Sequence, residues 1–158
     1  MISFGVLVHG GVGSSTRLTG ACKAACRKAF AMLEGGGRAI DAAIEAVRLL
    51  EDDGRFNAGS GSVLRLDGRT VEMDASVMDS SGLLGAVMAL KEARNPVLVA
   101  RAVCGTPHVA LAGAGADLFA RSMGFEGPGP VSERALRRYQ AMVRRLKDGK
   151  LRMKNGPW

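Results

Sequence analysis

The glycine-rich segment His9-Gly10-Gly11-Val12-Gly13 is the first part of the sequence whose residue types suit chemistry. Its glycines permit backbone conformations that other residues rarely adopt. Such a turn can aim backbone N–H groups at an anion or at a developing oxyanion. The spacing is not that of a G-x-G-x-x-G dinucleotide motif, and no Lys-Ser/Thr pair follows, as a Walker phosphate loop requires. A tight structural turn between a strand and a helix explains the segment equally well.

Side chains for nucleophilic or metal chemistry are sparse. The only histidines are His9 and His108, and neither lies in an H-E-x-x-H motif. Cys22 and Cys26 share one helix face at i, i+4 spacing, but small packing residues explain them better than a metal or redox pair. No Ser-His-Asp or Cys-His set with its own base is recognisable. The sequence therefore contains no complete catalytic set of a familiar kind.

The elements that would position the glycine-rich segment can be read from the residues around it. The apolar run Phe4–Val8 predicts a buried strand that leads into the turn. Hydroxyl residues after the turn offer N-caps for a helix that extends to about Glu34, where Gly35–Gly37 ends it. Apolar positions at helical spacing predict a second helix from about Ala39.

The composition of the sequence changes after this second helix. Residues 52–62 form a loop rich in glycine and polar residues. Residues 63–66, the turn pair Asp67-Gly68 and residues 70–77 then predict a β-hairpin. The unbroken apolar run at residues 84–90 predicts a central strand.

The next segment is predicted to contain two more helices. Pro96 is well placed at the first position of a helix that extends to about Val103. Residues 108–112 are expected to be a strand or an extended segment, and residues 115–123 a helix. Consecutive antiparallel strands flanked by helices favour an α+β fold with a helix-covered antiparallel sheet over a doubly wound parallel sheet.

A basic tail follows Gly127-Pro128-Gly129-Pro130. Residues 133–154 contain nine basic and two acidic residues, a net charge of +7 that equals the net charge of the whole chain. Helical spacing is recognisable from Val131 to about Lys147. Clustered Lys and Arg can neutralise nucleic-acid phosphates, but a solvated linker or surface helix fits the composition better. We therefore predict one domain portion at 1–126 and a basic, flexible linker at 127–158.

Composition places the chain among globular proteins with one core. Its 158 residues are 47% hydrophobic and 23% charged, ordinary values for one domain. Its longest apolar runs fall far short of the roughly 20 residues that a membrane span needs, so no membrane partner is expected. No secretory signal is visible at the N-terminus. Three cysteines cannot all pair, which favours a cytoplasmic protein.

Several segments, in this order and at this spacing, resemble the plant-type asparaginase and isoaspartyl-peptidase family of N-terminal-nucleophile hydrolases. The resemblance covers about residues 4 to 125. It is carried by Val8–Gly13, Leu50-Glu51, Phe56–Leu64, Val71–Asp79, Gly85–Val87, Asn95-Pro96, Ala100-Arg101 and Thr106–Val109.

The resemblance implies a four-layer αββα sandwich, made from a precursor that cleaves itself into two subunits. In this family the cut precedes a threonine in a Gly-Thr-Val-Gly-Ala-type segment. The new α-amino group, with a pKa of about 8, can act as base for the threonine hydroxyl. The present sequence contains no such segment. It therefore resembles the α subunit of an (αβ)₂ assembly whose β subunit carries the nucleophile. The resemblance makes residues 1–126 the α-subunit portion of the αββα hydrolase domain, and residues 127–158 the linker that leads to the cleavage point.

The implied activity is hydrolysis of L-asparagine to L-aspartate and ammonia, cleavage of isoaspartyl dipeptides, or both. Relatives of the glycosylasparaginase and taspase type are alternatives within the same class. A non-catalytic binding module that uses the basic tail on nucleic acid is the alternative from another class. The short N-terminus and the His9-Gly10-Gly11 segment favour the asparaginase branch.

The resemblance also assigns supporting roles to residues of this chain. Asn57 matches an asparagine near the nucleophile, and His9, Gly10 and Gly11 match a loop that packs against the active site and affects self-cleavage. No organic cofactor is implied. A structural sodium ion is implied, bound by the backbone carbonyls of Leu50, Glu51, Asp53, Phe56, Ala58 and Ser60. Gly54 stands where the family often has proline, which predicts a looser loop.

Overall fold

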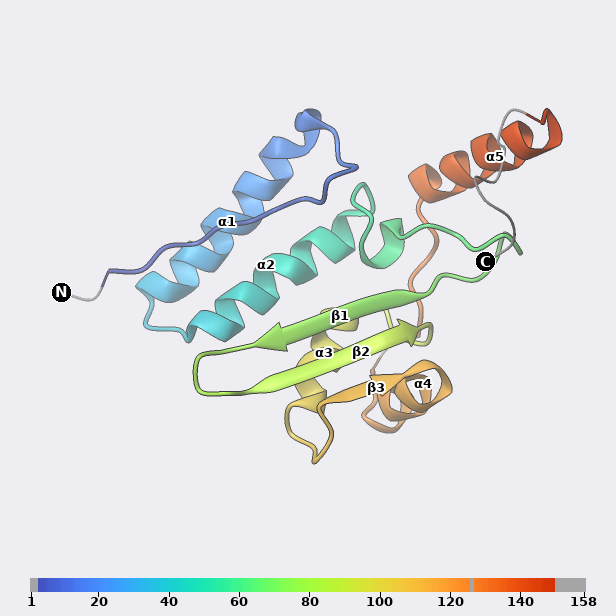
Figure 1. The fold of residues 1–158 in the computed structure, drawn as a ribbon. Helices are drawn as coiled ribbons and strands as arrows, with labels where there is room; N and C mark the ends of the chain where they lie inside the picture. Colours follow the sequence, from blue (N-terminus) through green and yellow to red (C-terminus); the bar gives the residue numbers. More distant parts are fainter. Residues whose placement is uncertain (1–2, 126, 150–158) are drawn as a thin grey trace.

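The computed structural model describes residues 3–125 and 127–149. Figure 1 shows a helical hairpin beside a small sheet, with a further helix at the end of the described chain. The helices are α1 (Thr19–Glu34), α2 (Ala39–Asp53), α3 (Pro96–Val103), α4 (Gly113–Ser122) and α5 (Glu133–Lys147), with single 3₁₀ turns at Thr16–Leu18 and Gly59–Gly61. The strands are β1 (Met73–Met78), β2 (Leu84–Leu90) and β3 (Ala110–Ala112).

The helical hairpin confirms the first two predicted helices. Ala25 and Ala29 of α1 and Ala42 and Ala46 of α2 are buried in one cluster. Alanines four residues apart lie on one helix face, and their small side chains let the two helices approach closely. The connection between the helices begins with the predicted glycine run, and the N–H of Gly37 donates to the carbonyl of Met32 at 2.8 Å.

The sheet has strand order β1-β2-β3 and is mixed, so the expectation of an antiparallel sheet is only partly confirmed. β1 and β2 are antiparallel, from Met73↔Leu90 to Met78↔Leu84. β3 is parallel to β2, because α3 carries the chain back across the sheet before β3 begins (Figure 1). α3 and α4 bury their apolar residues against one face of the sheet, in a cluster that includes Val87, Leu90 and Val99.

The predicted hairpin at residues 63–77 forms in reduced length. Only the pair Leu64↔Val71 forms a bridge outside the named strands, beside a hydrogen bond from Arg65 N to Thr70 O at 2.8 Å. β1 begins at Met73, where the register shifts, and the backbone N–H of Ala89 donates to the Asp74 carboxylate at 2.8 Å. Because this carboxylate takes an N–H at the bulge, the regular ladder starts only beyond it.

The prediction of a buried strand at Phe4–Val8 is wrong for this chain. The segment runs in extended form along α1 and α2 (Figure 1) and has no strand partner among the described residues. Val6 and Val8 pack against the helical hairpin, whereas Leu7 is 97% exposed. Its alternation of inward and outward side chains is strand-like, but a strand needs a neighbour to hydrogen-bond with.

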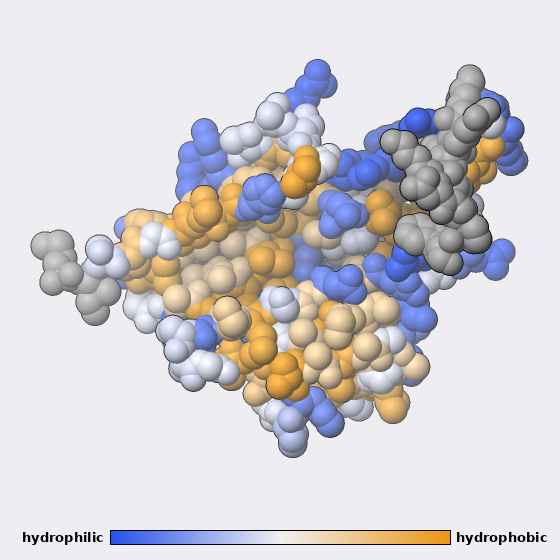
Figure 2. All heavy atoms as spheres, viewed as in Figure 1, coloured by the Kyte–Doolittle hydropathy of each residue, from blue (hydrophilic) through white to orange (hydrophobic). Residues whose placement is uncertain are grey.

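The second face of the sheet is uncovered by the described residues. Ser76, Met78, Leu84 and Met88 are exposed there, and Figure 2 shows a largely apolar surface over this part of the molecule. The chain is thus an α+β fold with a small sheet that is covered on one side. Within the described residues, none of the helices has both the length and the apolarity needed to cross a bilayer.

Helix α5 confirms the helical section predicted in the basic tail. Ser132 caps it, because its hydroxyl accepts the N–H of Ala135 at 3.2 Å. Ala135 is buried, and Ser132 N donates to Ser60 O at 2.9 Å. Further along the helix, the Tyr139 hydroxyl donates to Leu66 O at 3.1 Å. The first half of the predicted linker therefore contacts residues 60–66, and the flexibility of 127–158 stays a prediction.

Candidate functional site

A cavity of about 370 Å³ brings together the supporting residues that the sequence predicts. His9, Gly10, Gly11 and Asn57 all line it. Its remaining walls come from the end of α2, from Phe56 and Ala58 in the following loop, and from α5. Segments far apart in sequence therefore meet at one place, which makes this cavity the candidate functional site.

The glycine-rich turn is fixed by its own hydrogen bonds and by Phe56. Gly11 has φ +87°, and its N–H donates to His9 Nδ1 at 3.2 Å. The Ser14 hydroxyl donates to Gly10 O. A Cβ atom added to Gly10 would lie 2.7 Å from Cε1 of the buried Phe56 ring. Both glycines are therefore required by local geometry, so the segment is a structural turn and a wall of the cavity together.

Asn57 is held in a defined orientation at the edge of this cavity. Its side-chain Oδ1 accepts the backbone N–H of Val63 at 3.1 Å. The amide NH₂ group has no acceptor among the described residues, so it remains able to donate to a ligand or partner. The side chain is exposed. Its geometry suits a residue that presents one donor to a reacting group.

The loop that carries Asn57 depends on three glycines. Gly54 ends α2 with φ +71°, a left-handed conformation that proline cannot adopt because its ring fixes φ near −65°. Glycine at this position therefore closes the helix. Gly59 and Gly61 lie against backbone oxygens, and a Cβ atom at either position would collide with Glu51 O or Phe56 O respectively.

Three carbonyl oxygens of the predicted sodium site accept hydrogen bonds from protein groups. Glu51 O accepts the Ser60 hydroxyl at 3.2 Å, Ala58 O accepts Gly61 N at 3.0 Å, and Ser60 O accepts Ser132 N. The described residues contain no group of three or more His, Cys, Asp or Glu side chains arranged for a metal ion. The sodium site therefore stays a prediction, for which the loop offers backbone carbonyl oxygens, a ligand type that hard cations accept.

The buried side chain of Glu51 is a structural feature beside the site that was not predicted from the sequence. It is 3% exposed, and its carboxylate accepts Val97 N and Asn95 Nδ2, both at 3.1 Å. Burial raises the pKa of Glu51 to about 7, although both hydrogen bonds oppose that rise. A signal was present, because Glu51 follows Val47 by four residues and Ile44 by seven and so lies on the apolar stripe of α2.

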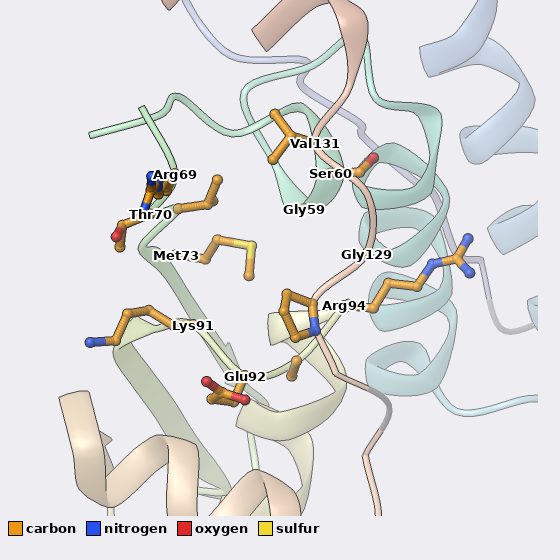
Figure 3. Close-up of a pocket in the computed structure, with 13 residues that line it drawn as sticks. Gly59, Ser60, Arg69, Thr70, Met73, Lys91, Glu92, Arg94, Gly129 and Val131 are labelled. Carbon is orange, nitrogen blue, oxygen red and sulfur yellow. The ribbon is translucent and has the colours of Figure 1, made fainter. Parts of the chain in front are cut away.

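A second cavity, of about 290 Å³, lies on the other side of the loop (Figure 3). Arg69, Lys91 and Glu92 line it, together with Arg94, whose Nε contacts the Asp52 carboxylate at 3.0 Å. None of His9, Gly10, Gly11 and Asn57 lines this cavity. Its cationic side chains are accompanied by carboxylates, and it is therefore a weaker candidate for the functional site.

Comparison with known proteins identifies the class to which this fold and site belong. A family model described as asparaginase matches residues 3–156, nearly the whole chain, and the chain therefore belongs to the asparaginase family.

Individual relatives carry related names. The chain is 49% identical over 126 residues to an isoaspartyl peptidase/L-asparaginase of Danio rerio. The aligned region covers 75% of this chain and 40% of that protein. It is 43% identical over 148 residues to a plant-type L-asparaginase of Thermococcus kodakarensis, covering 89% and 48% of the two chains. An isoaspartyl peptidase of Escherichia coli is 39% identical over 156 residues, covering 91% and 48%. The chain spans about half the length of these relatives or less.

Proposed function

We propose that this chain is the α subunit of an amidohydrolase that acts on L-asparagine, isoaspartyl dipeptides or both. In this proposal the nucleophile is a threonine at the N-terminus of a companion β subunit, released by self-cleavage of a common precursor. The family membership and the names of the relatives support this assignment. The chain alone would be inactive.

One observation carries the proposal. The cavity is lined by residues that the family resemblance places beside a nucleophile but, within the part of the chain that the structure describes, it contains no nucleophile with a base of its own. Asn57 and the His9–Gly11 turn line it, but the described residues around it contain no Ser, Thr or Cys hydrogen-bonded to a histidine or carboxylate. Next to it, the segment Phe4–Val8 has exposed strand-like backbone, and the sheet has an uncovered apolar face. These features fit a subunit that is completed by strands and a nucleophile from a companion chain.

The mechanism divides between the two subunits. The free α-amino group of the companion threonine takes the proton of its own hydroxyl, and that oxygen attacks the substrate amide carbon. The α-ammonium group returns this proton to the leaving nitrogen, so that ammonia or the amine released from a dipeptide departs, and water, deprotonated by the α-amino group, then releases aspartate from the acyl-enzyme. In this chain Asn57, fixed by the N–H of Val63, donates its amide NH₂ toward the threonine side of the site. The glycine turn limits how closely the companion chain can approach.

The sodium ion belongs to the same proposal. The carbonyls of Leu50, Glu51, Asp53, Phe56, Ala58 and Ser60 would hold it, and the ion would stabilise the loop that carries Asn57. Support comes from the family membership of the chain and from the carbonyl oxygens of Glu51 and Phe56, which lie against Gly59 and Gly61 of the same loop. Oxygen ligands of this kind suit a hard monovalent cation.

The proposed assembly is an (αβ)₂ heterotetramer in the cytoplasm, with an αββα sandwich built from both subunits. The uncovered face of β1 and β2 supports this architecture, because a second sheet would bury Met78, Leu84 and Met88. Burial of apolar surface at about 25 cal/mol per Å² would favour such packing.

Coexpression with the companion subunit tests the proposal. Intact-mass spectrometry of the purified complex should give two chains, the second beginning with threonine. Ammonia release from L-asparagine and amine release from an isoaspartyl dipeptide should require both chains. A companion with alanine in place of that threonine is the matched control and should bind without activity. Hydrolysis of asparagine by the 158-residue chain alone would refute the proposal. Exclusive cleavage of a glycosylated asparagine would favour the glycosylasparaginase alternative.

A further inference from the structure

Two arginines of α5 face the candidate site from the side opposite the glycine turn. Arg134 and Arg138 are four residues apart, so they lie on one helix face, and both line the 370 Å³ cavity. The helix is held in this position by the buried Ala135 and by the contact of Tyr139 with Leu66 O. The position of Arg134 and Arg138 beside the cavity therefore depends on how α5 docks.

Arg134 has an unusual environment for a cation. Its Nη1 atom is buried and has no hydrogen-bond partner among the described residues. A buried charged donor without an acceptor is costly, whereas a paired one is stabilising. The guanidinium charge is delocalised, so an anion bound by its other N–H groups would offset that charge, although Nη1 itself would still lack an acceptor.

The cavity lacks the acidic side chain that would normally balance these cations. None of the described residues that line it is Asp or Glu. The nearest acid in sequence, Glu133, forms an ion pair with Arg137 at 3.0 Å, so it is already engaged. By contrast, the 290 Å³ cavity of Figure 3 includes Glu92 in its lining, and Arg94 there pairs with Asp52.

Neutral donors in the same cavity complete a set that suits an anion. The Asn57 amide NH₂ and the backbone N–H groups of Val12 and Gly13 have no acceptors among the described residues. Backbone N–H groups in a glycine-rich turn bind anions well, because their partial positive charge is fixed in direction. Arginine forks match carboxylate and phosphate oxygens.

The geometry points to an oxyanion-binding site between the glycine turn and α5, with Arg134 and Arg138 as its charged ligands. The ligand is a small oxyanion, either a carboxylate or a free phosphate. The site shares its cavity and the Asn57 amide with the proposed hydrolytic function, but its charged ligands, Arg134 and Arg138, belong to this chain. Binding therefore does not need the companion subunit or any turnover.

Titration of the isotopically labelled 158-residue chain tests the site. Inorganic phosphate and succinate are added in separate arms, with ionic strength held constant by sodium chloride, while backbone amide and arginine Nε–H resonances are followed by NMR. Both arms are expected to shift the amides of Val12 and Gly13 in a saturable manner. The arm with the lower dissociation constant identifies the preferred source of the oxyanion.

Substitutions separate this site from general attraction of anions to a basic chain. Arg134→Gln and Arg138→Gln should each weaken binding about tenfold, as expected for loss of a charge-assisted hydrogen bond. Arg144→Gln removes the same charge from the same helix outside the cavity, and should leave the affinity unchanged. Because Arg138 is exposed, its variant remains informative if Arg134→Gln fails to fold. Linear, non-saturating shifts, or equal affinity in all three variants, would overturn the proposal.

Discussion

The buried carboxylate of Glu51 makes the stability of this chain depend on pH in an unusual direction. Its pKa in the folded chain is about 7, above the ordinary value of 4.5, because the group is buried. Between these two pH values the folded chain therefore holds a proton that the unfolded chain releases. The contribution of Glu51 to the free energy of unfolding is then fully present below pH 4.5, falls as the pH rises, and is lost above pH 7.

The size of this effect follows from the difference between the two pKa values. At 1.36 kcal/mol per pH unit, the loss amounts to about 3 kcal/mol between pH 4.5 and a pH above 7. Other carboxylates act in a different window. The pKa of Asp67 is lowered to about 2 by hydrogen bonds, chiefly to Thr70, so its contribution is lost only as the pH falls below about 4.

Replacement of Glu51 by glutamine isolates the effect. The glutamine oxygen can still accept Val97 N–H, as the protonated acid does, but the group no longer titrates. Urea unfolding followed by circular dichroism, at several pH values from 4.5 to 8, gives the free energy of unfolding for each protein. The wild-type value should fall across this range by about 3 kcal/mol more than the Glu51→Gln value.

Glu45→Gln is the matched control on the same helix. A hydrogen bond from Arg48 lowers the pKa of Glu45, so this variant should lose stability without changing the slope between pH 4.5 and 7. Parallel pH profiles for the wild type and Glu51→Gln would refute the reasoning, because they would mean that Glu51 ionises in the folded chain at its ordinary pKa.

Two further predictions concern the loop and α5. Gly61→Ala forces a Cβ into Phe56 O and should lower the free energy of unfolding by about 1–3 kcal/mol in urea titrations. Gly20→Ala, in open space within α1, should instead raise it by about 0.5–1 kcal/mol, and destabilisation by both would contradict the argument. Tyr139→Phe removes the hydrogen bond to Leu66 O and should speed amide hydrogen exchange in α5 several-fold, with rates in α1 unchanged as the internal control. Equal exchange rates in α5 would mean that this contact does not hold the helix.

Helix ends were predictable because their signals are local. Pro96 stands at the first position of α3, and Gly35–Gly37 follows α1 at the predicted end. A residue that cannot continue a helix, or that readily begins one, acts without help from distant parts of the chain. The turn at Asp79 is also held locally, since its carboxylate accepts the N–H groups of Ser81 and Leu83.

Strand pairing was less predictable because it depends on partners far away in sequence. Residues 4–8 have the pattern of a strand, yet no described strand lies beside them. β3 is parallel to β2 only because α3 crosses the sheet between them. A run of apolar residues indicates that a strand is buried. It does not indicate the direction of that strand or the strand with which it pairs.

The candidate site, too, was predictable where the signal is local and not where it depends on distant segments. His9, Gly10, Gly11 and Asn57 were found from the family resemblance, and they do meet in one cavity. Arg134 and Arg138 were seen in the sequence only as part of a basic tail. Their meeting with the glycine turn depends on the docking of α5 against residues 60–66, which no local pattern encodes.

Glu51 links the candidate site to the core through two different groups of one residue. Its backbone oxygen accepts the Ser60 hydroxyl and lies against Gly59, so it anchors the loop that presents Asn57. Its buried carboxylate accepts Val97 N at the start of α3, the helix that covers the sheet. A displacement of α3 would therefore move the end of α2 and the loop together. The position of Asn57 depends on packing beneath the sheet as well as on the residues that line the cavity.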